Sequence, residues 1–219
     1  MHKWLLKAAL LLITAIAAST AHAQAGVTPV NPPQPVENDG KVEVLEVFAY
    51  GCIHCAELES PFEVWRKKQK PDVKVKRIPT PVPIMGIDSS VLYYTLEALG
   101  QIDRLHPKIF EAIHLQKVIL GNPAALSKWL EKNGVDPKKY EAAQSSFSVV
   151  TKANRARQIV SAYKIRNTPT LIVNGRYLVV EQKNGGIPAM LATVDQLIGE
   201  ARATQKATSS SAVTKSVAK

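Results

Sequence analysis

The chemistry of this sequence centres on two cysteines, Cys52 and Cys55, which are separated by two residues. Such a pair can form half of a zinc site, attach haem, close an inert disulfide or carry out thiol–disulfide exchange. A zinc site would lack a second cysteine pair. Beyond residues 1–23 and His54, only His106 and His114 remain as further nitrogen ligands. Haem attachment requires a histidine directly after the second cysteine, where this chain has Ala56. A disulfide across so short a loop constrains the unfolded chain little, so redox chemistry is the favoured interpretation.

The elements around the pair predict that its two sulfurs differ. Residues 41–50, KVEVLEVFAY, are typical of a buried strand, and residues 55–68 are typical of a helix. If the helix begins at or just after Cys52, that sulfur lies beside unpaired backbone N–H groups and the positive end of the helix dipole. Both favour the thiolate and lower the pKa of Cys52. We expect Cys55, one turn further along, to be more buried and to act as the resolving thiol.

Two side chains near the pair are candidates for acid–base chemistry. His54 either stabilises the Cys52 thiolate through its imidazole or is a solvated residue at a helix start. Glu46 interrupts an otherwise apolar strand. It is either an outward-facing strand residue or a buried carboxyl with a raised pKa that relays a proton to or from Cys55. The residues alone leave both alternatives open.

The two ends of the chain differ from its centre. Residues 1–23 combine two lysines, an apolar stretch and small residues before Ala23, as in a secretory signal cleaved after that residue. Residues 24–40 contain four prolines and predict an extended arm without an obvious first strand, and residues 202–219 predict a disordered polar tail. Much of the net charge of +10 lies at the two ends, so we expect no binding to nucleic acid.

The central residues predict an α/β fold. A hydrophobic content of 46% is enough to build a core and excludes disorder for most of the chain. A second strand at residues 73–78 indicates a parallel strand–helix–strand unit within residues 41–87. Apolar spacings of three and four predict four short helices within residues 88–148. Residues 149–201 then predict a helix, a β-hairpin that turns at Asn174-Gly175 and a closing amphipathic helix.

Three segments resemble the DsbA family of periplasmic thiol-disulfide oxidoreductases. VLEVFAYGCIHC is similar to the family's strand and active-site helix start, TPTLIVNGRY to its proline loop and hairpin, and GVDPKKYEAAQSSF to part of its helical region. The resemblance covers residues 41–201 and implies a thioredoxin-like fold with an inserted α-helical domain at residues 88–148. It also implies a cis bond between Thr168 and Pro169, which brings the Thr168 backbone beside Cys52 to pair with an extended substrate. The chain departs from the family pattern at Ile53, where proline is typical, and at Thr168, where valine is common.

The resemblance implies a periplasmic dithiol oxidase that donates a Cys52–Cys55 disulfide to newly exported, unfolded proteins. It also favours the buried-acid interpretation of Glu46. A membrane DsbB protein linked to quinones is the expected reoxidant, and we expect a monomer that needs no cofactor or metal. One alternative is a disulfide isomerase or reductase, which Thr168 mildly favours, although the arm is too short for the dimerisation domain that such isomerases usually carry. Another is a thioredoxin-like chaperone or peptide-binding module.

Overall fold

The computed structural model describes residues 26–37, 39–181 and 185–217, with the side chains described up to Lys206. The predicted signal and its cleavage point lie outside the described residues. The elements, in chain order, are β1 (Val27–Pro29), β2 (Val42–Phe48), α2 (Ile53–Lys67), β3 (Val73–Pro79), α3 (Ser89–Ala98), α4 (Ile102–His114), α5 (Pro123–Lys132), α6 (Pro137–Gln144), α7 (Phe147–Ala162), β4 (Thr170–Val173), β5 (Tyr177–Val180) and α8 (Gly186–Val217).

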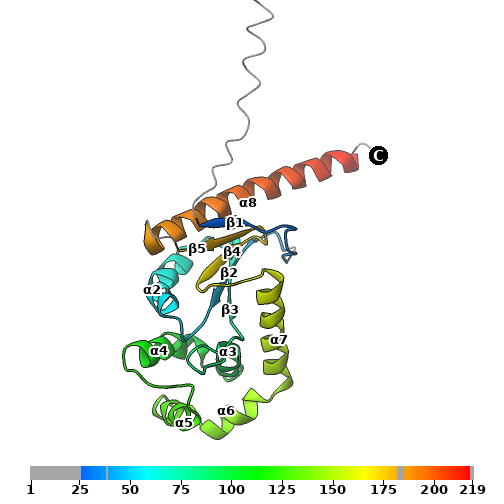
Figure 1. Ribbon diagram of the computed structural model, residues 1–219. Coiled ribbons are helices and arrows are strands. Elements are labelled where there is room, and N and C mark those ends of the chain that lie inside the picture. The colour runs from blue at the N-terminus through cyan, green and yellow to red at the C-terminus, as the bar shows by residue number, and fades with distance from the viewer. Residues whose placement is uncertain (1–25, 38, 182–184, 218–219) are drawn as a thin grey trace, which may run out of the picture.

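One five-stranded sheet forms the centre of the molecule, with strand order β1-β5-β4-β2-β3 (Figure 1). β2 and β3 are parallel and are connected through α2, whereas the other neighbouring strands are antiparallel. β4 and β5 form the hairpin that Asn174-Gly175 predicted. The strand–helix–strand unit and the hairpin expected from the sequence are therefore confirmed.

Helices cover both faces of this sheet. Side chains alternate along each strand, so β2 presents apolar residues to both faces. Val42 and Val44 of β2 pack in one cluster with Phe62 of α2 and with apolar residues of α8. Leu45 and Val47, which point to the opposite face, pack in another cluster with residues of α7. The sheet therefore forms a middle layer, with α2 and α8 on one face and α7 on the other.

The four helices α3, α4, α5 and α6 lie between β3 and α7 in the chain and form a separate group below the sheet in Figure 1. Their apolar residues share a cluster with Phe48, Tyr50 and Cys55. The expected number of short helices and the thioredoxin-like fold with a helical insertion are confirmed. The boundary drawn after residue 148 falls inside α7, since that helix starts at Phe147.

The arm at residues 24–40 was expected to contain no strand, and this expectation is wrong. Residues 27–29 form β1, which pairs antiparallel with β5. Pairing with a distant strand is not visible in local composition, and proline is tolerated at the edge of a sheet. Pro29, at the end of β1, therefore obscured a short edge strand.

The disordered tail expected from Arg202 onward is also corrected. α8 continues without interruption to Val217. Residues 202–217 contain neither glycine nor proline, and extending an existing helix costs far less than starting one. Arg202 also binds both carboxylate oxygens of Asp72, at 2.6 and 2.9 Å, which holds this part of α8 against the start of β3.

Ending the chain after Lys206 tests the extension of α8. We expect the molar far-ultraviolet circular dichroism to lose the helical signal of residues 207–217, because those residues are removed and no other segment becomes helical in their place. The contact between Arg202 and Asp72 remains in the shortened chain, so the thermal midpoint should stay within about 2 °C of the original. An unchanged molar helical signal would contradict the helix and restore the disordered tail.

Candidate active site

Cys52 occupies the N-cap of α2, directly before the first helical residue. No side chain caps this helix, and its first turn holds no acidic residue. By contrast, Asp88 and Ser146 accept hydrogen bonds from the first N–H groups of α3 and α7. The N–H groups that begin α2 are therefore left for an anion, and the nearest candidate is the sulfur of Cys52.

The sulfur of Cys52 is partly exposed and strongly favours the thiolate. Its pKa is lowered to about 5, first by a hydrogen bond with the thiol of Cys55. A side-chain hydrogen bond with Thr168 and the backbone N–H groups of Cys55 and His54 act in the same direction, against the opposing effect of partial burial. As a thiol, Cys52 donates to the carbonyl oxygen of Thr168 at 3.2 Å.

Cys55 behaves in the opposite way. Its side chain is fully buried, and burial raises its pKa well above the usual range for a thiol, with a further contribution from the neighbouring Cys52. Both cysteines are free in this structure, which therefore describes the reduced pair. The predicted difference in burial is confirmed, and the single proton of the ionised pair stays on Cys55.

His54 lies at the solvent-facing side of the helix start. Its side chain is 61% exposed, and Nδ1 lies 3.1 Å from Oε2 of Glu57 and 3.9 Å from Oε2 of Glu181. His54 acts on the Cys52 thiolate through its backbone N–H. Because the ring contacts carboxylates, stabilisation of the thiolate by the imidazole stays a prediction.

Glu46 is buried in the centre of β2, with a side chain only 1% exposed. Burial raises its pKa to about 7, although the positive charge of Arg77 opposes this shift. Nε of Arg77 donates to Oε2 of Glu46 at 3.0 Å, since the two residues are partners in the parallel β2–β3 register. The outward-facing alternative is therefore wrong.

Arg77 connects Glu46 to further polar side chains that the sequence analysis missed. Its Nη2 donates to Glu59 of α2 at 3.1 and 3.2 Å and to Glu63 at 2.6 Å. Oε2 of Glu59 in turn lies 3.1 Å from Nε2 of His106. The sequence contains one signal for the role of Arg77. The alternation of Val73 and Val75 predicts an apolar residue at position 77, where the chain has arginine. A buried acid on the neighbouring strand requires such a cation.

Thr168 and Pro169 lie beside the cysteines, just before β4, and the bond between them is cis as expected. The carbonyl of Thr168 faces the sulfur of Cys52, as the 3.2 Å contact shows. Within the described residues, the N–H of Thr168 has no hydrogen-bond acceptor. This backbone is therefore available to an extended chain placed next to the sulfur.

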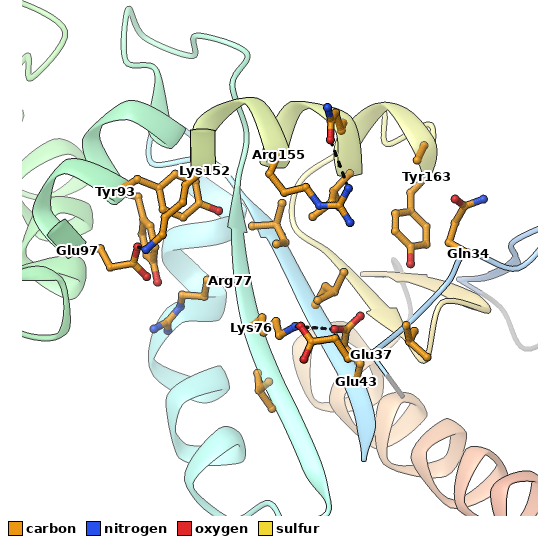
Figure 2. A pocket seen from close by; sticks show the side chains of 18 of the residues that line it. Gln34, Glu37, Glu43, Lys76, Arg77, Tyr93, Glu97, Lys152, Arg155 and Tyr163 are labelled. Atoms are coloured by element: carbon orange, nitrogen blue, oxygen red, sulfur yellow. Dashed lines mark hydrogen bonds and ion pairs between the residues drawn. The ribbon is translucent and has the colours of Figure 1, made fainter. Parts of the chain in front are cut away.

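A cavity lies elsewhere in the described residues, on the side of the sheet that α7 covers. Its volume is about 830 Å³, and it is lined by parts of the arm, β3, α3 and α7 (Figure 2). Ion pairs between neighbours occupy its walls, such as Lys76 with Glu37 and Glu43, and Lys152 with Glu97. None of the site residues predicted from the sequence lines this cavity.

Neither a metal site nor a membrane-spanning helix is found in the part of the chain that the structure describes. No group of three or more histidine, cysteine or acidic side chains is arranged to hold a metal ion. No described helix is long and apolar enough to cross a membrane.

Comparison with known proteins places this geometry in a family. Residues 85–188 match the family model described as a DSBA-like thioredoxin domain. The thiol:disulfide interchange protein DsbA of Bordetella parapertussis is 41% identical over 201 residues, which cover 90% of this chain and 96% of the relative. DsbA of Azotobacter vinelandii is 34% identical over 171 residues, which cover 78% of this chain and 80% of the relative.

Solved structures agree with the sequence relatives. The crystal structure of Pseudomonas aeruginosa DsbA superposes with a TM-score of 0.75 at 32% identity, covering 83% of this chain and 94% of that one. NmDsbA1 from N. meningitidis has a TM-score of 0.69 at 31% identity, with coverage of 83% and 94%. Since identity of about two residues in five extends over 90% of this chain, the chain belongs to the DsbA family and is a thiol:disulfide oxidoreductase.

Proposed function

We propose that the protein is a dithiol oxidase that donates a Cys52–Cys55 disulfide to newly exported proteins. The observation that carries this proposal is the position of Cys52 at the uncapped N-terminus of α2, where its pKa falls to about 5. The thiolate exists only in the reduced protein. Every interaction that stabilises it therefore favours reduction of the pair and makes the disulfide a stronger oxidant.

The reaction moves two electrons from the substrate to the cysteine pair. A substrate thiolate attacks the sulfur of Cys52, the bond between Cys52 and Cys55 breaks, and its electron pair passes to the sulfur of Cys55. A second substrate thiolate then attacks the substrate sulfur of the mixed disulfide. Cys52 leaves as a thiolate, and the substrate is released with its own disulfide.

Exposure directs the first attack to Cys52, because Cys55 is fully buried. The departing sulfur of Cys55 needs a proton, since its pKa is raised by burial. We assign Glu46 the role of supplying and later accepting this proton. Its pKa of about 7 lets it hold a proton at the pH of exchange, and Arg77 keeps the carboxyl in place below α2.

The remaining assignments concern substrates and partners. The backbone of Thr168, before Pro169, is proposed to pair with the extended substrate beside Cys52, and His54 supplies a backbone N–H to the thiolate. The reduced pair must pass its two electrons to an acceptor. We propose a DsbB-like membrane quinone reductase for this step, with the protein acting as a monomer in the periplasm.

Oxidation of a reduced, unfolded protein with several cysteines tests the proposed direction. We expect the oxidised protein to oxidise this substrate rapidly and to reshuffle a scrambled version of it poorly. Cys52→Ser should abolish exchange. In Cys55→Ser, the Cys52 thiolate can attack the disulfides of the scrambled substrate, and the resulting mixed disulfides should accumulate because no resolving thiol remains. Efficient reshuffling by the reduced protein would promote the isomerase alternative. Activity retained without both cysteines would favour the chaperone.

The pKa of Cys52 predicts how redox state and pH together affect stability. A depressed pKa in the folded state stabilises the reduced protein fully above the usual thiol pKa of 9 and loses this effect as the pH falls toward 5. The disulfide form has no such group. The thermal midpoint of the reduced form should exceed that of the oxidised form, by a margin that shrinks steadily from pH 9 to 5. A margin independent of pH would contradict the assignment.

Glu46→Gln tests the proton transfer, with Glu43→Gln as a matched control. Glu43 lies on the same strand but points to the other face, where it binds Lys76. We expect Glu46→Gln to slow reduction of the disulfide by at least about tenfold and to remove the rate change centred near pH 7. Protonated Glu46 is the donor. In the unmodified protein, the rate of disulfide reduction divided by the concentration of substrate thiolate should therefore fall as the pH rises through 7. Equal rates in the two variants would leave Glu46 a purely structural residue.

A further inference from the structure

Tyr50 lies two residues before Cys52 in the turn that precedes α2. The N–H of Cys52 donates to the carbonyl of Ala49 at 3.1 Å, which closes a four-residue turn with Tyr50 and Gly51 at its centre. Tyr50 is completely buried. The orientation of the peptide between Tyr50 and Gly51 therefore helps to determine where the sulfur of Cys52 points.

All three polar groups of Tyr50 are bound by side chains of the helical insertion. Its N–H donates to Oγ of Ser89 at 2.9 Å, and its hydroxyl lies 2.8 Å from Nδ1 of His106. Its carbonyl oxygen lies 2.8 Å from Nε2 of His114, the last residue of α4. A carbonyl can only accept, so Nε2 of His114 carries the hydrogen. The helical insertion thus holds the turn at three points.

Glycine at the next position makes one of these contacts more important than the others. A side chain at Gly51 would meet the backbone oxygen of Ile84 at 2.7 Å, so the close packing of this loop requires glycine. Glycine also lets the central peptide of a turn rotate between its two common orientations, one of which needs a positive φ at that residue. Gly51 does not have a positive φ here. Close packing therefore requires glycine at position 51, and glycine leaves the Tyr50–Gly51 peptide free to change its orientation.

We propose that His114 is a positioning residue of the redox reaction. By donating to the Tyr50 carbonyl, it holds the Tyr50–Gly51 peptide in one orientation, and this keeps the sulfur of Cys52 against the N–H groups of α2. The ring stacks on Phe110, with centroids 6.3 Å apart and planes inclined by 28°, which fixes the donor nitrogen. This inference rests on the proposed attack at Cys52. It adds a residue that lies far from the pair in sequence and does not touch the sulfur.

His114→Phe and His114→Gln separate the hydrogen bond from the space that the ring occupies. Phenylalanine keeps a ring beside Phe110 but has no donor, whereas the glutamine amide can donate to the Tyr50 carbonyl. Gln116→Leu is the matched control, because it removes a neighbouring hydrogen bond, to Glu111, without affecting Tyr50. His114→Leu replaces the phenylalanine variant if that variant does not fold.

The measurement is the thiolate absorbance of Cys52 as a function of pH, with the glutathione equilibrium as a second readout. We expect His114→Phe to raise the titration midpoint by about half to one pH unit, a three- to tenfold change in the thiolate equilibrium. The glutathione equilibrium should shift by a similar factor toward the oxidised protein. His114→Gln should restore most of both values, and Gln116→Leu should change neither.

Two results would overturn the role of His114. One is a midpoint in His114→Phe equal to that of the unmodified protein, and the other is an equal shift in the phenylalanine and glutamine variants. The unmodified protein separates this failure from failure of the proposed function. If its own Cys52 titrated like an ordinary thiol, the oxidase assignment itself would be wrong.

Discussion

The unpaired N–H groups at the start of α2 are the constraint on which the rest of this structure depends. Every helix begins with N–H groups that lack partners, and α3 and α7 satisfy some of theirs with Asp88 and Ser146. α2 has Cys52 in this place, and a cysteine satisfies these groups well only as a thiolate. The helix start is therefore completed in the reduced protein and left incomplete in the disulfide form. The local stability of one helix end and the oxidising power of the pair have the same physical origin.

The buried charges beneath the pair follow from strand register. Glu46 and Arg77 are partners in the parallel pairing of β2 with β3, so the acid inside the sheet meets a guanidinium without any loop to position it. Arg77 also binds Glu59, and Glu59 contacts His106 of α4. Because each buried charge has a partner, the cost of removing it from water is offset. The same contacts join the sheet to the helical insertion.

Local signals were sufficient to predict the centre of the site, and long-range pairing explains what was missed. The Cys52–Cys55 spacing between a strand and a helix predicted a low pKa for one sulfur and burial of the other, and the resemblance to a family added the cis bond before Pro169. β1 was missed because an edge strand of three residues depends on its partner rather than on its own composition. Arg77 was assigned to a strand, but its partner Glu46 lies 31 residues earlier in the chain, and only the register brings them together. The length of α8 was underestimated because small polar residues can extend a helix that is already packed.

Ile53 illustrates how this fold separates two demands on one short segment. It is the first residue of α2, and half of its surface is exposed. Proline, which is typical at this position in the family, would remove one backbone N–H from the helix start, whereas isoleucine retains it. The side chain itself faces water beside the sulfur and does not belong to the buried clusters. Variation at this position can therefore alter the donors and the apolar surface around Cys52 while the packed interior stays the same.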